Sequence, residues 1–143
     1  MVDNELRAKR EALVLQHIDA ENRHDVAGTI ATMARPRYDV VAWNIQIEGP
    51  EAVGEFLAGY FAMLPSIITE AERVHHADDA VIVEVWTHGQ HTGEFEGIPA
   101  NGNPIDVRSI GIFYFDGEDM IGEKVMADTD TLVRQLRGEV APA

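Results

Sequence analysis

The sequence of 143 residues contains no cysteine and no long apolar run. The lack of cysteine excludes disulfides, thiolate metal sites and a cysteine nucleophile. No apolar stretch approaches the ~18 residues that a membrane-spanning helix requires. Residues 1–7 are polar and of mixed charge, which is not the pattern of a signal or transit peptide. We therefore expect a cytoplasmic protein with no membrane partner.

Basic residues are also scarce. The chain has 11 Lys and Arg against 25 Asp and Glu, a formal net charge of -14, and its basic residues are scattered. A nucleic-acid-binding surface needs clustered positive charge, so we expect no nucleic-acid partner. The negative charge also disfavours strongly anionic ligands. A neutral or weakly charged small organic ligand fits this composition best.

What the sequence does contain is the composition of one globular domain. Hydrophobic residues make up 45% and charged residues 25% of the chain, which is the usual balance for such domains. The length suits one domain with a sizeable core. No internal repeat, low-complexity tract or linker divides the chain. We expect a single domain over residues 1–143, with its core between about residues 6 and 137.

Helical patterns dominate the first half of the chain. Residues 4–23 carry one apolar stripe among many charges, as a surface helix does. Asp25 can cap a shorter helix over residues 26–34. Residues 50–64 give the clearest pattern, because apolar side chains recur there at spacings of three and four until Pro65 stops the helix.

The second half is patterned as strands. Helices followed by a run of strands predict an α+β fold with an antiparallel or mixed sheet. A curved sheet wrapped around the apolar helix would leave a cavity between them, so we expect a pocket. The expected strands are one or two short ones in 40–47 and four long ones at 66–76, 80–91, 105–115 and 120–128, with a loop at 93–104 and a final helical turn or two at 129–137.

Three stretches near the C-terminus carry a family resemblance. Residues 88–99 read HGQHTGEFEGIP, residues 115–123 read FDGEDMIGE, and residues 128–136 read DTDTLVRQL. They resemble the "HTGxFxGIPPTG" stretch, the "F-DGKIxE" hairpin and the closing "DxxTLLxQLG" of the SnoaL-like polyketide cyclases. That family belongs to the nuclear transport factor 2-like superfamily. The departures are Ala100 and Asn101, which stand where the family often has proline and threonine, and Trp43-Asn44, which stands for its early His or Asn-Pro.

The resemblance implies a fold and a chemistry. The fold is an α+β cone of cystatin-like architecture, whose curved sheet wraps around N-terminal helices and opens onto an apolar pocket. The characterised cyclases carry out an intramolecular aldol condensation without metal or cofactor. The motifs place the family's general acid/base at Asp128 and its pocket histidine at His91. The superfamily also implies a homodimer, with a tetramer as the alternative.

Asp128 ends the last expected strand, where it alternates in phase with Met126. If Met126 faces the interior, Asp128 lies at the rim of the pocket, and burial there would raise its pKa towards the working pH. The alternative is that Asp128 or Asp130 caps the final helix. We assign the catalytic role to Asp128 and the cap to Asp130.

His91 ends the strand that precedes the loop. Near Asp128 it could polarise a carbonyl group or share a proton; the alternative is a surface histidine at a strand end. His88 and His91 are three residues apart, and on a strand this spacing points them to opposite faces. We therefore expect no metal site, and the resemblance implies that no cofactor is needed.

The remaining candidates form the pocket wall. Phe61 and Leu64 come from the central helix, and Trp43, Trp86 and Met126 are apolar candidates from elsewhere in the chain. Simple packing in the core is the alternative for each of them. Arg108 is either a rim residue for a substrate ester or a solvated charge beside Asp106.

Other functions of the same fold stay open. Ketosteroid-type isomerisation needs a Tyr or a protonated acid opposite the base. Epoxide hydrolysis needs an Arg between two carboxylates, for which Asp106 and Arg108 give a weak hint. A non-catalytic ligand-binding or dimerisation module needs neither. A cavity in which acid/base groups converge would favour an enzyme.

Overall fold

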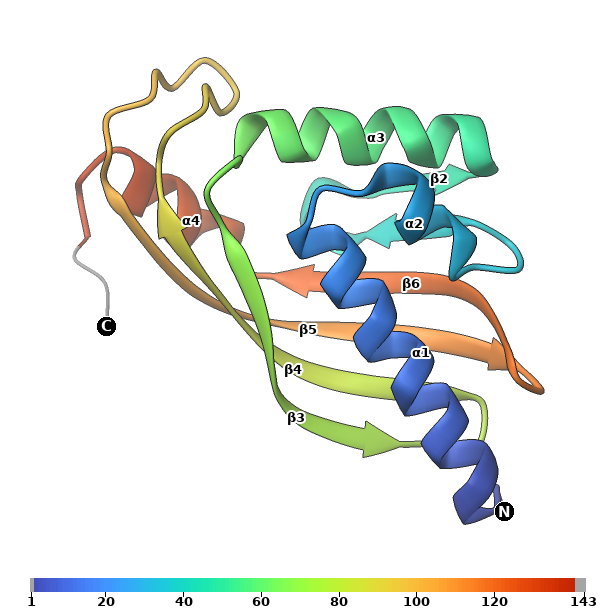
Figure 1. Ribbon diagram of the computed structural model, residues 1–143. Helices are drawn as coiled ribbons and strands as arrows, with labels where there is room; N and C mark the ends of the chain where they lie inside the picture. Colours follow the sequence, from blue (N-terminus) through green and yellow to red (C-terminus); the bar gives the residue numbers. More distant parts are fainter. Residues whose placement is uncertain (1, 141–143) are drawn as a thin grey trace.

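The computed structural model describes residues 2–140 and shows a curved sheet with three helices against its concave side (Figure 1). The sheet lies below α3 and behind α1 in this view, and a fourth helix closes one end of it. In chain order the elements are α1 (Asn4–Asn22), α2 (Val26–Ala31), β1 (Arg37–Val40), the 3-10 turn η1 (Val41–Trp43), β2 (Ile45–Glu48), α3 (Pro50–Met63), β3 (Ile68–His76), β4 (Ala80–Gln90), β5 (Pro104–Asp116), β6 (Asp119–Ala127) and α4 (Thr129–Leu136).

The sheet is mixed and six-stranded. Its order is β2-β1-β6-β5-β4-β3. β1 pairs with β6 in parallel, and every other neighbouring pair is antiparallel. The long strands β4, β5 and β6 are sequential hairpin partners, whereas β1 joins the sheet from the first half of the chain. The α+β cone with a curved mixed sheet, expected from the sequence, is confirmed.

Polar side chains begin the helices. Asp3 caps α1 by accepting a hydrogen bond from the Leu6 amide at 2.8 Å, and Asp25 caps α2 in the same way from the Gly28 amide at 2.8 Å. α3 starts at Pro50, whose ring suits the first helical turn. The second helix is shorter than the predicted 26–34. It stops at Ala31 because the chain then turns to the sheet, where the Ala34 amide donates to the Met120 carbonyl.

The core lies between the concave face of the sheet and the helices. Val81, Val83 and Val85 of β4 alternate towards it, and all three are buried. Leu57 and Phe61 of α3 pack against the same cluster. Asn22, at the end of α1, ties this layer to β3, because its side-chain amide exchanges two hydrogen bonds with the backbone of Thr69 at 2.8 and 2.9 Å.

The helices of residues 2–140 include none that combines the length and the hydrophobicity needed to cross a membrane.

Candidate functional site

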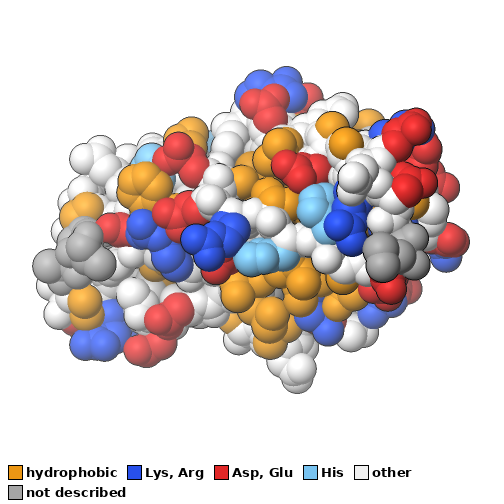
Figure 2. All heavy atoms as spheres, turned by 90° about the horizontal axis from the view of Figure 1, so that it is seen from below, with side chains coloured by type: hydrophobic (Ala, Val, Ile, Leu, Met, Phe, Trp, Pro, Cys, Tyr) orange, Lys and Arg blue, Asp and Glu red, His pale blue; other side chains and the backbone are white. Residues whose placement is uncertain are grey.

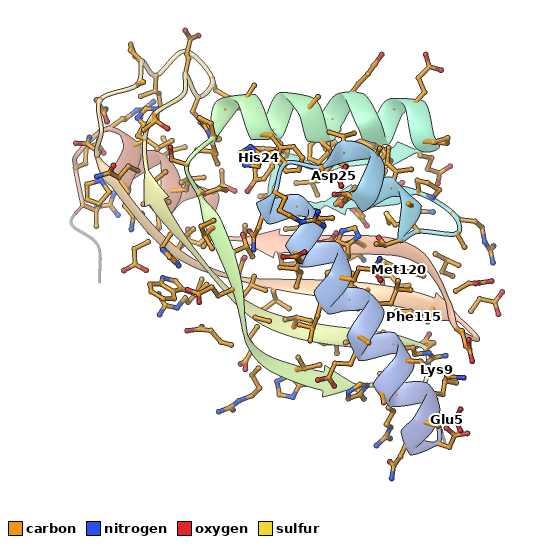
Figure 3. The ribbon with its side chains drawn as sticks, in the orientation of Figure 1. Glu5, Lys9, His24, Asp25, Phe115 and Met120 are labelled. Carbon is orange, nitrogen blue, oxygen red and sulfur yellow. The ribbon has the colours of Figure 1, made fainter. Side chains whose placement is uncertain are left out.

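A cavity of about 150 Å³ lies between α3 and the concave face of the sheet. Most of its wall is apolar, and aromatic rings form much of it. His24, just after α1, also reaches it; Figure 3 shows this residue beneath α3. The His24 ring stacks on Phe61, with 4.7 Å between ring centroids. The wall contains no Lys or Arg among the residues described.

Four side chains form a buried polar cluster at this cavity: His17, Glu21, Tyr38 and Glu123. Glu21, Tyr38 and Glu123 line the cavity, and His17 lies behind them with no exposed surface. α1 supplies His17 and Glu21 one helical turn apart, and β1 and β6 supply the other two. Tyr38 and Glu123 are direct partners in the parallel pairing of these strands, which brings both side chains to the same place.

Hydrogen bonds fix the orientation of the His17 ring. The Thr32 hydroxyl donates to the Thr29 carbonyl at 2.6 Å, so it accepts the Nδ1–H of His17 at 2.6 Å. Nε2 of His17 therefore faces the rest of the polar cluster. It lies 2.8 Å from the Tyr38 hydroxyl, 3.1 Å from Glu123 Oε2 and 3.3 Å from Glu21 Oε1.

The Tyr38 hydroxyl completes the network by donating to Glu21 Oε1 at 2.7 Å. Because its proton points to Glu21, its oxygen is free to accept a hydrogen bond from Nε2 of His17. Each polar atom of this network that faces His17 thus has a partner. Buried groups held in this way keep a fixed geometry for proton transfer.

The two carboxylates set the protonation of His17. Burial lowers the pKa of the His17 imidazole, but the charge of Glu21 and hydrogen bonds to Glu123 and Glu21 outweigh this effect and raise the pKa to about 10. His17 is therefore an imidazolium at neutral pH. Burial and the charge of Glu21 raise the pKa of the Glu123 carboxyl. Burial, followed by the charges of Glu21 and Glu123, also raises the pKa of Tyr60, which lines the same cavity, well above its usual value.

One donor set could also hold a cation. The ligand atoms of His17, Glu21 and Glu123 lie within 4.8 Å of one another, a combination that the sequence pattern did not predict. The Nε2 proton of the imidazolium already occupies the space between these atoms. The arrangement is therefore better suited to holding and moving a proton than to binding a metal ion.

The structure places Asp128 outside the cavity wall, although its neighbours Ala127 and Thr129 both line it. Asp128 is the N-cap of α4: its carboxylate accepts from the Thr131 amide at 3.0 Å and from the Thr131 hydroxyl at 2.6 Å. These bonds hold the pKa of Asp128 below its usual value. The assignment of the cap to Asp130 and the expectation of a raised pKa were wrong, because the carboxylate points to solvent.

His91 is buried, but it does not line the cavity. Its Nδ1 lies 3.1 Å from Asn101 Oδ1, and its backbone amide and carbonyl bond to residues 101–103. His91 therefore holds the loop between β4 and β5. No described hydrogen bond links the His91 ring to the polar cluster. Its Nε2 has no hydrogen-bond partner among residues 2–140.

The other six candidates divide between the two faces of the sheet. The structure places Trp43, Phe61 and Leu64 in the cavity wall. It places Trp86, Arg108 and Met126 on the opposite side, where Arg108 lies over the Trp86 ring at 4.7 Å and Met126 is 38% exposed.

This division follows from strand alternation. In β4 the cavity side chains are Val85 and Thr87, so Trp86 between them points outward. In β6 the side chains that face the cavity are Glu123, Val125 and Ala127. Met126 therefore points outward, and the expectation that it faces the interior was wrong. A shift of register between Tyr114 and Phe115 changes the phase near the hairpin, which is why Met120 is buried although Met126 is not.

Arg108 does sit between two carboxylates, as epoxide hydrolysis would require. It bonds to Asp106 at 2.7 Å and to Glu72 at 3.2 Å. All three groups lie on the outer side of the sheet, away from the cavity, so this trio does not support epoxide opening there.

The polar cluster itself was missed by the sequence interpretation. Two signals could have found it. His17 and Glu21 are four residues apart, next to the apolar stripe of the first helix, which places both on one helix face. Glu123 is the closing glutamate of the recognised hairpin motif, although its inward direction could not be read from the motif.

Comparison with known proteins gives a match to one family model. A family model described as SnoaL-like polyketide cyclase matches residues 11–136. No curated protein matches the sequence.

Solved structures of the same fold come from several bacteria. A protein from Jannaschia sp. CCS1, provisionally assigned as a SnoaL-like polyketide cyclase, has a TM-score of 0.82 at 21% identity, with 99% of each chain covered. AclR from Streptomyces galilaeus, provisionally assigned as a hydroxylase, has a TM-score of 0.78 at 19% identity, with 92% of this chain and 97% of that chain covered. IdmH from Streptomyces antibioticus, provisionally assigned as a polyketide cyclase, has a TM-score of 0.77 at 15% identity, with 90% and 98% covered.

Proposed function

The chain belongs to the SnoaL-like polyketide cyclase family, and from this premise we propose that it is a cofactor-independent enzyme that moves a proton next to the carbonyl group of a small, mainly apolar compound. The observation that carries the proposal is the position of Glu123. This carboxyl group lines an apolar cavity, yet it is buried between His17 and Tyr38. Such an environment is what a general acid/base requires.

Two members of the polar cluster, Glu123 and His17, have roles in the proposed reaction, together with Tyr60 of the cavity wall. The Glu123 carboxylate removes a proton from the carbon next to the carbonyl, and an enolate forms. The Tyr60 hydroxyl, held protonated by its raised pKa, donates a hydrogen bond to the enolate oxygen. His17 stabilises the ionised form of Glu123 before the proton arrives.

Two outcomes of this enolate fit the family. In an intramolecular aldol reaction the enolate carbon attacks a second carbonyl of the same molecule, and Glu123 returns its proton to the alkoxide that forms. In an isomerisation Glu123 returns the proton to another carbon of the enolate system. Both are lyase- or isomerase-type steps that need no metal or redox cofactor.

We assign the acid/base role to Glu123 in preference to the motif residue Asp128. The Asp128 carboxylate is engaged by Thr131 and has a pKa below its usual value, so it is a weak base at neutral pH. Glu123 is buried, and burial raises its pKa above the usual value. The motif alone points to Asp128, whereas burial and the hydrogen bond to His17 favour Glu123.

Exchange of carbon-bound protons for deuterium tests this assignment without the natural substrate. Small ketones that fit the cavity are incubated in deuterium oxide, and NMR measures the loss of the proton next to the carbonyl. We expect exchange catalysed by the wild type, a fall of at least about a hundredfold in Glu123→Gln, and no change in Asp128→Asn. Loss of exchange in Asp128→Asn, with Glu123→Gln still active, would return the role to Asp128.

We also propose that the chain works as a cytoplasmic homodimer. The outer sheet face, which we define as the side of β3, β4, β5 and β6 away from the cavity, exposes Ile68, Ile110 and Met126. Ile110 and Met126 are direct cross-strand partners. Seen from the side opposite α3, apolar side chains gather between charged ones (Figure 2). Arg73, Arg108, Glu72 and Glu84 surround the groove at Ile110 and Met126, so the face can pair with its own copy about a two-fold axis.

A further inference from the structure

The charges at the cavity are unbalanced. Two carboxylates, Glu21 and Glu123, reach the wall, and His17 is the cation that faces them from behind. His24 is the other basic side chain at the wall, and its ring stacks on Phe61 instead of bonding to the carboxylates. The part of the wall that the structure describes contains no Lys or Arg. With both carboxylates ionised, the polar cluster therefore carries an excess negative charge.

Aromatic rings continue from this negative charge along the cavity. The Tyr38 hydroxyl bonds to Glu21, and the Tyr38 ring lies 5.7 Å from the Phe56 ring. Phe56 in turn lies 6.4 Å from both Tyr60 and Trp43. All of these residues line the cavity. We call Tyr38, Trp43, Phe56 and Tyr60 the aromatic row.

An aromatic row beside a carboxylate is the arrangement that recognises an organic cation. The negative face of an aromatic ring attracts a positive charge, and the attraction is larger when the site is shielded from water. A carboxylate that stays ionised next to the rings adds a direct charge interaction. A metal ion or a simple alkali cation would gain little from the apolar remainder of the wall, whereas the body of an organic molecule would fill it.

We propose that the substrate of this cavity is an organic cation: a carbonyl compound that carries a protonated or quaternary amine, with its positive charge against Glu21 and the aromatic row. Glu21 is the more open of the two carboxylates, since its side chain is 21% exposed and that of Glu123 is 8% exposed. Glu21 can therefore face the ammonium group while Glu123 remains available for proton transfer. This inference rests on the proposed function, for which it names the substrate class.

Cation binding should release a proton from the protein. Burial raises the pKa of Glu123, so this carboxyl takes up a proton more readily than an exposed one as the pH is lowered, and that proton reduces the excess negative charge. An ammonium group in the cavity favours the ionised carboxylate and displaces that proton. The titratable groups that face this position are His17, Glu21, Tyr38 and Glu123 of the polar cluster, together with His24 and Tyr60. Affinity for the cation should therefore fall as the pH is lowered.

A pair of isosteres tests the charge alone. Benzyltrimethylammonium and neopentylbenzene have the same shape and differ in whether nitrogen or carbon stands at the branch point. Their binding is followed by the fluorescence of Trp43 in the Trp86→Phe variant, which leaves one of the two tryptophans. Because benzyltrimethylammonium has no proton to lose, any proton released in calorimetry comes from the protein.

We expect the cation to bind at least about tenfold more tightly than its neutral isostere, with proton release. Glu21→Gln should remove most of this preference. Glu55→Gln is the matched control: it changes the net charge equally, but Glu55 is exposed on α3 and does not line the cavity. Circular dichroism and a melting curve verify that each variant is folded.

Two results would overturn the inference. Equal or tighter binding of the neutral isostere would show that the cavity does not recognise positive charge. A preference unchanged by Glu21→Gln would show that the charge is recognised elsewhere. In both cases deuterium exchange that depends on Glu123 would leave the proposed function standing, whereas loss of that dependence would contradict the proposed function separately.

Discussion

His17 is the residue on which the polar cluster depends, because it brings a buried positive charge to two carboxylates. Its pKa is raised from 6.5 to about 10 in the folded protein. A group whose pKa is higher when folded contributes stability that is complete below its unfolded pKa and is lost as the pH rises through its folded pKa. The free energy of unfolding should therefore fall between about pH 7 and pH 10.

The variant His17→Leu tests the same contribution directly. It leaves Glu21 and Glu123 without their buried counter-charge, so we expect a loss of about 3–5 kcal/mol in urea unfolding at pH 7. Much of the pH dependence above neutrality should disappear with it. His75→Leu is the control, because the His75 side chain is 49% exposed and its removal should cost little. A His17→Leu protein as stable as the control would contradict the buried ion network.

Asp128 gives a prediction with the opposite pH dependence, because its pKa is lowered in the folded protein whereas that of His17 is raised. Because it caps α4 through Thr131, Asp128→Ala should lower the melting temperature slightly at pH 7 and leave ligand affinity unchanged. Its pKa is below the usual value when folded, so its contribution is present above the usual carboxyl range and is lost as the pH falls through its folded pKa. The difference in melting temperature between Asp128→Ala and the wild type should therefore become smaller at acidic pH. A variant with normal stability but no ligand binding would argue against the cap.

At the scale of residues, the sequence identified the kinds of side chain that form the site better than it identified whether each one is buried. The family motif pointed to Asp128 at the end of the last strand, whereas Glu123 lies in the middle of β6. Whether a carboxylate there is buried depends on the phase of the strand, which a register shift at Tyr114 and Phe115 sets. His17 meets Glu123 across 106 residues of chain, and no local pattern of the sequence predicts such a contact.

At the scale of elements, the loop between β4 and β5 is fitted tightly onto the end of α3. At Gly93 an added Cβ would lie 2.5 Å from the Ala62 carbonyl oxygen and 2.7 Å from that of Met63. These are backbone atoms at the helix end and cannot turn away as a side chain could. The residue at position 93 must therefore be small if α3 and this loop are to meet.

Gly93→Ala should destabilise the protein by about 1–3 kcal/mol, because the loop must move away from α3. Gly59→Ala is the matched control. Gly59 lies in α3 with no atom within 4 Å of an added Cβ, so alanine there should stabilise the helix by up to about 1 kcal/mol. The measurement is urea unfolding of both variants. Equal effects in the two would show that the close approach at Gly93 does not matter.

Element ends were predicted well where proline, glycine or a capping aspartate marks them. Asp25 starts α2, and Pro50 starts α3 as expected from the sequence. Residues 40–47 were harder, because Asn44 adopts a left-handed conformation with φ of 52° after the η1 turn. That turn divides the segment into two strands that pair with each other, and apolar periodicity does not reveal it.

At the scale of the whole molecule, the proposed dimer concerns the outer sheet face. Ile110→Lys would place a charge at the centre of that face, opposite Met126, and like charges would then meet across a two-fold axis. We expect it to shift the protein from dimer to monomer in sedimentation velocity. Leu15→Lys is the control, since Leu15 is 43% exposed on α1, away from the outer sheet face. A monomeric wild type would contradict the dimer, as would an Ile110→Lys variant that remains dimeric.

The global shape followed from features that the sequence carries along most of its length. The order of helices and strands, together with the apolar helix at residues 50–64, predicted an α+β fold with a cavity, and the family resemblance predicted the cone. The side chains that line the cavity were harder to predict, because they depend on which side of each strand faces inward. The same uncertainty placed Trp86, Arg108 and Met126 in the pocket, although they lie on the outer sheet face.

The central claim is that Glu123, and not Asp128, is the carboxyl group that serves the cavity. Carboxylate NMR across a pH titration, with and without benzyltrimethylammonium, tests it most directly. We predict a pKa for Glu123 above its usual value that falls when the ligand binds, and a pKa for Asp128 below its usual value that does not move. A Glu123 resonance with an ordinary pKa and no response to ligand, beside an Asp128 resonance that shifts, would contradict the account.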